Sequence, residues 1–109
     1  VHLGTTGDTY CTNMENVSVV RFARGSDAVL DLLNHQIDAI VIDDFVANNL
    51  VNKNSGNIKK LDQALTNEEY MFCVDKGNTE LLSFLNDSIF KLKNSGELDK
   101  IIQKYIDQE

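Results

Sequence analysis

A glycine-rich turn near the start of the chain is the first place where the sequence could bind a ligand. Residues 4–8 read Gly-Thr-Thr-Gly-Asp and follow residues 1–3, which are typical of the end of a strand. Glycines let a backbone approach a ligand closely, and N–H groups at the start of a helix can hold an anion. In the alternative interpretation the turn is structural, and Thr5 or Thr6 only caps the helix. The pattern alone leaves both interpretations open.

The same turn does not match the common nucleotide-binding motifs. No Lys-Ser or Lys-Thr pair follows it, and the carboxylate of Asp8 would repel a phosphate group. The third glycine of the dinucleotide-binding fingerprint is also missing. If the turn binds an anion, we therefore expect one of the size of a carboxylate.

Two adjacent aspartates are the second candidate. Asp43 and Asp44 follow the apolar run at residues 39–42. One of them can cap the helix that follows, which leaves the other able to bind an ammonium group at a crevice. Two adjacent carboxylates make a poor metal site by themselves, and we predict neither a metal nor a cofactor.

The two histidines do not indicate catalysis. Neither His2 nor His35 is paired with an Asp and a Ser at places that would form a triad. We expect His35 in the polar end of a helix, exposed to solvent, whereas His2 precedes the turn and could point into the crevice. Neither histidine therefore supports a catalytic triad, and no combination of residues in the chain predicts an enzyme or a catalytic residue.

Composition and charge narrow the classes of protein. The 109 residues carry a net charge of −7, which repels phosphate backbones and anionic lipids, so nucleic acid is not expected as a partner. No apolar run approaches the roughly 18 residues of a membrane span. The chain has no signal peptide and no initiator Met, and we expect a processed product or a part of a longer protein.

Cys11 and Cys73 match no zinc or redox spacing, and two buried free thiols are favoured over a disulfide.

Alternating strands and helices are expected to position these residues. Apolar and β-branched segments predict strands at residues 1–3, 17–22, 39–42, 58–61 and 70–74. Helical spacing of apolar residues predicts helices at 8–15, from an N-cap at Ser26, after Asp44, after Gly77 and at the C-terminus. The expected fold class is α/β, with a mostly parallel sheet, helices on both faces and a C-terminal helix pair. Because ligands bind at the carboxyl ends of parallel strands, the turn and Asp43 should face the same crevice.

A series of motifs runs in order along the whole chain. Its members are Gly4-Thr5-Thr6-Gly7-Asp8-Thr9-Tyr10, Arg21-Phe22, Gly25-Ser26-Asp27-Ala28, Asp38-Ala39-Ile40-Val41-Ile42-Asp43, Glu69-Tyr70, Lys76-Gly77-Asn78-Thr79-Glu80-Leu81, Leu92-Lys93-Asn94-Ser95-Gly96-Glu97-Leu98 and residues 101–105. The series closely resembles the type II periplasmic-binding-protein family, and within it the binders of polar amino acids. The order of the motifs is far more specific than any single one of them.

The resemblance implies a protein with two α/β lobes and a ligand held between them. Residues 1–74 correspond to the second lobe with its returning crossover strand, and residues 75–109 to helices that pack on the first lobe. The main part of that first lobe would lie outside this chain. The apolar stripe of the C-terminal helices would then lack its sheet, and we expect it to fold back on this lobe, to swap with a second copy or to bury itself in a homodimer.

The resemblance also implies roles for individual residues. The backbone N–H of Thr6, with Thr5 beside it, would hold the α-carboxylate of the ligand, and Asp43 would hold its α-ammonium group. His2 falls near the ligand side chain. An anion site next to a carboxylate suits a zwitterion such as an amino acid.

The implied function is that of the substrate-binding component of an amino-acid ABC uptake transporter. Such a protein is extracytoplasmic, either in the periplasm or lipid-anchored at the cell surface as a lipoprotein. It binds a polar L-amino acid and docks on a membrane permease. Two alternatives use the same scaffold: the sensing lobe of a receptor kinase, and an enzyme resembling cyclohexadienyl dehydratase. The enzyme would need acid and base groups around the crevice, where this chain offers Asp43, Asp8 and His2.

Overall fold

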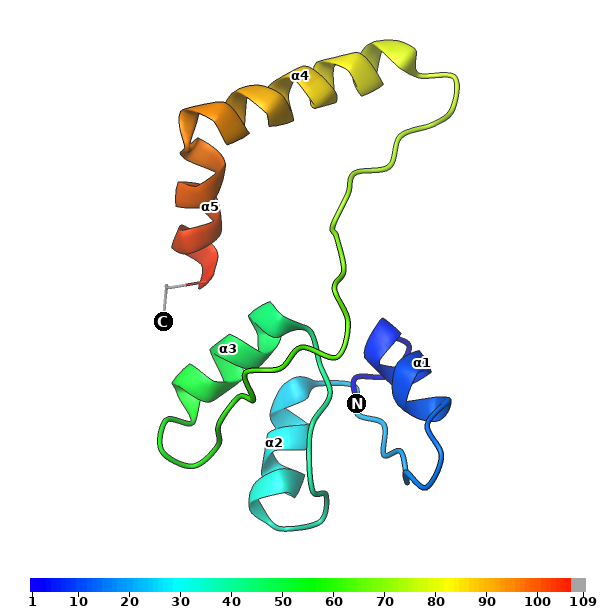
Figure 1. Ribbon diagram of the computed structural model, residues 1–109, viewed down its shortest axis with the longest axis vertical. Coiled ribbons are helices and arrows are strands. Elements are labelled where there is room, and N and C mark those ends of the chain that lie inside the picture. The colour runs from blue at the N-terminus through cyan, green and yellow to red at the C-terminus, as the bar shows by residue number, and fades with distance from the viewer. Residues whose placement is uncertain (107–109) are drawn as a thin grey trace. The chain divides into compact units, whose positions relative to one another are not determined.

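A computed structural model describes residues 1–106, and its regular elements are helices (Figure 1). The chain divides into two compact units. The N-terminal unit comprises residues 1–64 and contains α1 (Thr6–Thr12), α2 (Gly25–Leu33) and α3 (Asp44–Lys53). The C-terminal unit is described from residue 65 to residue 106 and contains α4 (Thr79–Ser95) and α5 (Glu97–Ile106).

The expected parallel sheet does not form within residues 1–106. Strand pairing in this range is limited to one isolated parallel bridge between His2 and Phe22. In it the N–H of Phe22 donates to the carbonyl of Val1 at 3.0 Å, and the N–H of Leu3 donates to the carbonyl of Phe22 at 2.9 Å. The prediction of an α/β fold with a mostly parallel sheet is therefore wrong for this chain.

The physical reason is that a strand is defined by its partner. An apolar, β-branched segment favours an extended backbone, but a ladder needs a neighbour that pairs with its N–H and C=O groups. Residues 1–3 and 20–22 meet over one bridge. The segments expected as strands at 39–42, 58–61 and 70–74 have no strand pairing in the structure. Sequence periodicity identified the extended segments and did not supply their partners.

The first helix begins earlier than expected. We predicted a helix at residues 8–15, and α1 starts at Thr6 and ends at Thr12. Its start is set by Thr5, which has an extended backbone and accepts the N–H of Asp8 on its hydroxyl at 3.4 Å. A threonine hydroxyl in this place satisfies one of the helix-start donors that lack a partner within the helix.

The N-cap of the second helix also differs from the prediction. Ser26 lies inside α2, and the N-cap residue is Arg24, whose extended backbone precedes the helix. Arg24 makes no side-chain capping hydrogen bond. Its guanidinium instead donates twice to the carboxylate of Asp27, at 3.0 Å each, and this pair raises the pKa of Arg24. Asp27 lies in the first turn of α2, where its negative charge also interacts favourably with the helix dipole.

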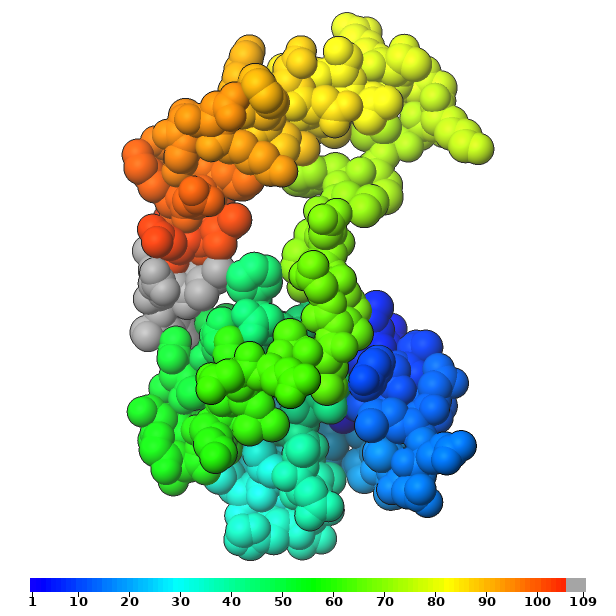
Figure 2. Space-filling view, in the orientation of Figure 1, coloured from blue at the N-terminus to red at the C-terminus, as the bar shows by residue number. Residues whose placement is uncertain are grey.

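A small apolar core holds the N-terminal unit together. Its buried side chains are Val1, Cys11, Ala28 and Val29. The start of α2 lies close to α3, because a Cβ added to Gly25 would lie 3.1 Å from Cδ1 of Leu50 and 3.3 Å from Cδ1 of Ile42. The space-filling view shows the helices of this unit as one continuous body (Figure 2). The core is therefore formed by residue 1, α1 and α2, and α3 lies against the start of α2 without a buried side chain of its own.

The C-terminal unit consists of an extended segment and two helices that pack on each other. Asn78 caps α4 by accepting the N–H of Leu81 on its side-chain oxygen at 3.1 Å. Gly96 separates the helices with a φ of 75°, a left-handed conformation that favours glycine at a helix end. Neither helix in the described part of this unit, nor any helix before it, has the length and apolar character to cross a membrane.

The two cysteines differ in their environment. Both thiols are free, Cys11 is buried in the N-terminal unit, and Cys73 is exposed in the C-terminal unit. The expectation of a buried free thiol is thus confirmed for Cys11 and wrong for Cys73. Cys73 belongs to the segment expected as a strand at 70–74, and without strand pairing this segment leaves most of its side chains in solvent.

Candidate functional site

The glycine-rich turn is tied to the strand segment that precedes it. The hydroxyl of Thr5 donates to the carbonyl of His2 at 2.8 Å and also caps α1 by accepting the N–H of Asp8. The structural interpretation of the turn therefore holds for the Thr5 side chain. Thr6 follows as the first residue of α1 and is exposed.

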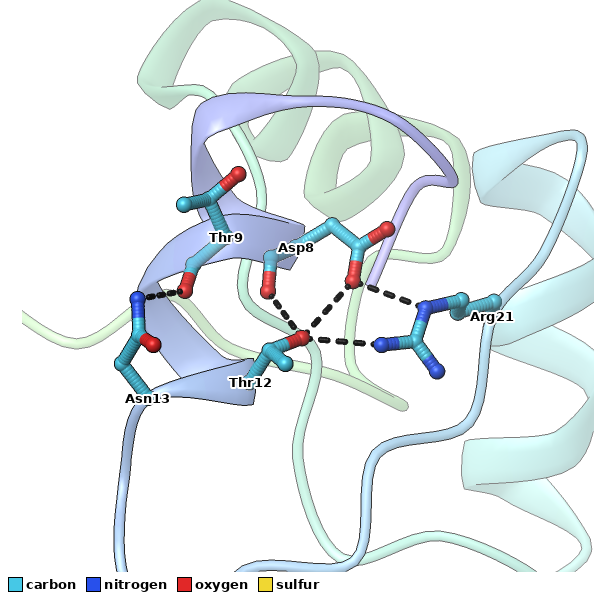
Figure 3. A pocket seen from close by; sticks show the side chains of 5 residues that line it. All are labelled: Asp8, Thr9, Thr12, Asn13 and Arg21. Carbon is cyan, nitrogen blue, oxygen red and sulfur yellow. Dashed lines mark hydrogen bonds and ion pairs between the residues drawn. The ribbon is translucent and has the colours of Figure 1, made fainter.

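Asp8 is the most connected polar residue of the turn. Its Oδ2 accepts the N–H of Gly4 at 3.0 Å. Its Oδ1 accepts the Nε–H of Arg21 at 2.9 Å, a contact drawn in Figure 3. The hydrogen bond from Gly4 is the largest influence that lowers the pKa of Asp8 below its ordinary value, and partial burial opposes it. The positive charge of Arg21 and hydrogen bonds from Thr12 and Arg21 lower this pKa further. Asp8 is therefore ionised at neutral pH.

A polar depression of about 220 Å³ lies beside this carboxylate. Its lining consists of Asp8, Thr9, Thr12, Asn13 and Arg21 (Figure 3). The lining groups bind one another: Nη2 of Arg21 donates to Oγ1 of Thr12 at 2.8 Å, and Nδ2 of Asn13 donates to the carbonyl of Thr9 at 2.9 Å. Oγ1 of Thr12 lies 2.7 Å from the carbonyl oxygen of Asp8 and 3.2 Å from its Oδ1. The lining of the depression is thus a hydrogen-bond network that links α1 to Arg21.

Gly7 brings the turn into contact with the segment that leads to the second candidate. A Cβ added to Gly7 would lie 3.3 Å from the carbonyl oxygen of Val41 and 3.6 Å from its Cγ1. The first of these distances is shorter than an ordinary contact, so the backbones approach each other closely because residue 7 has no side chain. Val41 is two residues before Asp43. The turn and the approach to Asp43 therefore lie next to each other.

The two aspartates have separate environments. Asp43 is half-buried and is the N-cap residue of α3, but its side chain does not make the capping hydrogen bond that we expected of one member of the pair. Asp44 is exposed and accepts a hydrogen bond from Nζ of Lys60 at 2.7 Å. The Asp44 carboxylate is thus engaged with a lysine of a later segment.

The two histidines differ in burial and in their contacts. His2 is half-buried, and its backbone takes part in the bridge to Phe22 and accepts the hydroxyl of Thr5. His35 follows the end of α2 with a φ of 56° and is exposed, as predicted. Within residues 1–106 the structure contains no group of three or more His, Cys, Asp or Glu side chains that could hold a metal.

Sequence reasoning missed Arg21 and Thr12 as members of the polar network. A signal for Thr12 was present, because it follows Asp8 by four residues and such residues share one face of a helix. Arg21 carried no comparable signal, since its contact with Asp8 spans 13 residues of sequence. A contact of that kind follows from how the segment 17–22 packs on α1.

Comparison with known proteins identifies what the chain is similar to. The sequence profile of bacterial extracellular solute-binding proteins, family 3, matches residues 7–108. A probable histidine-binding protein of Neisseria gonorrhoeae is 33% identical over 113 residues, covering 97% of this chain and 41% of that protein. An L-cystine-binding protein of Escherichia coli is 29% identical over 106 residues, covering 96% of this chain and 40% of that protein.

A third relative comes from a different bacterium. An ABC transporter glutamine-binding protein of Bacillus subtilis is 28% identical over 111 residues, covering 98% of this chain and 40% of that protein. The chain therefore spans about two fifths of the length of the relatives that it matches. No solved structure matches the chain.

Proposed function

The chain belongs to family 3 of the bacterial extracellular solute-binding proteins, and from this premise we propose that it is part of the substrate-binding component of an amino-acid ABC uptake transporter. The ligand is a polar L-amino acid. Relatives named as histidine-, cystine- and glutamine-binding proteins support this ligand class. The role is binding and delivery, without catalysis. The sensing and dehydratase alternatives are not favoured. The three binding proteins are matched over about two fifths of their length, whereas a putative sensor protein of Shewanella frigidimarina is matched over 14% of its length.

The close approach of Gly7 to Val41 is the observation that carries the proposed ligand site. It supports a pair of recognition groups at the two ends of an amino acid. In the proposal, the backbone N–H of Thr6, with Thr5 beside it, holds the α-carboxylate, and Asp43 holds the α-ammonium group. His2 lies near the ligand side chain. Charge-assisted hydrogen bonds of this kind are about twice as strong as neutral ones. They therefore make the site selective for a zwitterion.

The division of labour within the whole protein is part of the same proposal. Residues 1–74 act as the second lobe with its returning crossover segment, and residues 75–109 as helices that pack on the first lobe. The ligand closes the two lobes together, and the closed form docks on a membrane permease. The protein works outside the cytoplasm, in the periplasm or lipid-anchored at the cell surface. A homodimer through the C-terminal helices finds no support in the comparisons.

Calorimetric titration of the full-length protein tests the function. The ligands are L-histidine, L-cystine and L-glutamine, each compared with the carboxamide that replaces its α-carboxylate. We expect at least one amino acid of this panel to bind, and its carboxamide to bind about tenfold more weakly or worse, because the carboxamide lacks the negative charge. Glucose serves as the control ligand. The proposal is wrong if no amino acid of the panel binds, or if amino acid and carboxamide bind equally well.

A further inference from the structure

Asp8 joins three parts of the N-terminal unit through one carboxylate. It belongs to α1, its Oδ2 accepts the N–H of Gly4 in the turn at 3.0 Å, and its Oδ1 accepts Nε–H of Arg21 in the segment 17–22 at 2.9 Å. Only 8% of its surface is exposed. Hydrogen bonds of an ion are stronger where water competes weakly. The carboxylate is therefore well placed to hold the turn against the rest of the unit.

Arg21 is itself held in place by α1. Its Nη2 donates to Oγ1 of Thr12 at 2.8 Å, while its Nε donates to Asp8. The two donors lie in one rigid plane, so the guanidinium fits both acceptors at once. A lysine at this position would offer a single ammonium group on a flexible stem. The network therefore depends on the shape of arginine as well as on its charge.

Packing does not fix the beginning of the turn. Gly4 has a φ of 74°, which is left-handed, and no atom lies within 4 Å of the place where its Cβ would be. Thr5 is tied to His2 by its hydroxyl at 2.8 Å. The hydrogen bond between Gly4 and Asp8 is thus the contact that closes the turn from its other side, toward Arg21.

From this geometry we propose that Asp8, supported by Arg21 and Thr12, is a positioning residue that holds residues 4–7 in the conformation that receives the ligand carboxylate. The inference rests on the proposed function and extends it to the network behind the ligand contacts. Both oxygens of Asp8 are engaged by Gly4 and Arg21, so Asp8 acts through the turn and not on the ligand. The positive charge of Arg21 compensates a carboxylate that would otherwise repel the ligand's own.

Asp8→Asn in the full-length protein is the test. Asn keeps the size of the side chain, but an NH₂ group replaces one of the two carboxylate oxygens and cannot accept a hydrogen bond. At least one of the two bonds, from Gly4 or from Arg21, is therefore lost, together with the negative charge. The probe is the amino acid of the panel that binds the wild type most tightly, together with its carboxamide. We expect the Kd of the amino acid to rise about tenfold and that of the carboxamide less than about threefold, because the lost contact acts on the carboxylate end.

Asp27→Asn is the matched control. It removes the other arginine–aspartate pair of the same unit, in which Arg24 donates twice at 3.0 Å. This pair has no hydrogen bond to the turn among those found in residues 1–106. We expect Asp27→Asn to leave the ratio of the two Kd values unchanged. A loss of discrimination as large as that of Asp8→Asn would overturn the inference.

The outcomes separate the inference from the function on which it rests. If the wild type binds the amino acid and discriminates against the carboxamide, but Asp8→Asn changes both Kd values equally or changes neither, the positioning role is wrong and the proposed function stands. If the wild type binds nothing in the panel, both are wrong.

Arg21→Lys provides a second test should Asp8→Asn fail to fold. Lysine keeps the positive charge and loses the fork that reaches both Asp8 and Thr12. We expect the Kd of the amino acid to rise about threefold, with faster amide hydrogen exchange at residues 4–7 of the unliganded protein. Unchanged affinity together with unchanged exchange would overturn the inference.

Discussion

The two units of the chain form helices equally well but bury their side chains to very different extents. In the N-terminal unit, Ala28 and Val29 of α2 are 1% and 3% exposed. In the C-terminal unit no described side chain is buried, and Phe84 and Phe90 of α4 are 64% and 67% exposed. Local capping can start and end a helix such as α4, whereas burying its apolar face requires another surface. Helix formation and core formation are thus separate properties of this sequence.

The ion pairs of the two units also differ. In the N-terminal unit the pair between Arg24 and Asp27 joins residues three apart, but the pairs between Arg21 and Asp8 and between Lys60 and Asp44 join segments that are distant in sequence. The pair between Lys100 and Glu97 in α5 joins residues three apart on one helix. Pairs between distant segments fix a three-dimensional arrangement, while pairs within a helix support only that helix. The proposed ligand site accordingly lies in the N-terminal unit.

Removing the carboxylate of Asp43, the proposed partner of the ligand's α-ammonium group, should have the largest effect on amino-acid affinity. We expect Asp43→Ala in the full-length protein to lower amino-acid affinity by about 1.5–3 kcal/mol, because a charged hydrogen bond in a closed cleft is lost. Asp44→Ala is the matched control, since Asp44 is 69% exposed and paired with Lys60, and it should change the affinity less than about threefold. Calorimetric titration of both variants measures the effect. Equal losses would mean that the site does not distinguish the two carboxylates.

Core and surface substitutions test the contrast in burial directly. In the 109-residue chain, Val29→Ala should lower the free energy of unfolding by about 2 kcal/mol, because it leaves a cavity in the core. Phe84→Ala should lower it by less than about 0.5 kcal/mol, because that ring is already in solvent. Urea unfolding curves measure both values.

The same pair of substitutions in the full-length protein sharpens the comparison. If the C-terminal helices pack on the first lobe, Phe84→Ala should there cost about 3 kcal/mol, as it does for a buried ring. An equally small cost in both proteins would contradict the proposed packing of residues 75–109.

Thr6 allows the backbone donor to be removed without loss of the helix. It is the first residue of α1, where proline is well tolerated, and Thr5 before it already has the extended backbone that proline requires. We expect Thr6→Pro to weaken amino-acid binding about tenfold, because the N–H is deleted, and Thr6→Ala to weaken it less than about threefold. Melting temperatures of both variants provide the control for folding. Equal effects of the two variants on affinity would assign the role to the hydroxyl.

Acid should reduce the stability of the N-terminal unit through Asp8, with the smallest of these effects. The pKa of Asp8 is lowered in the folded state, so its ionised form stabilises the fold above the ordinary pKa of an aspartate. This contribution is lost as the pH falls below about 4 and through the lowered pKa. Unfolding curves of the wild type and Asp8→Asn should differ at neutral pH and converge in acid. A difference that persists at low pH would show that Asp8 acts through something other than its charge.

Part of the candidate site could be predicted because its signals are local. The Gly-Thr-Thr-Gly turn, the aspartates after an apolar run and the ordered series of motifs were all readable from the sequence, and the family that they indicated is confirmed. The roles of Thr5, Thr6, Asp43 and His2 toward a ligand stay predictions. The Asp8–Arg21 contact could not be foreseen, since nothing in either residue's neighbourhood specifies the other.

The sequence by itself determined where helices form, because apolar spacing, glycine breaks and caps such as Asn78 act within a few residues. Only the tertiary structure decided which extended segments pair, which thiol is buried and which acid holds the turn. These properties depend on the surfaces that meet. Segment 1–3 pairs with Phe22, whereas segments 39–42, 58–61 and 70–74 have no strand pairing within residues 1–106. An apolar extended segment does not form a sheet unless another segment pairs with its backbone.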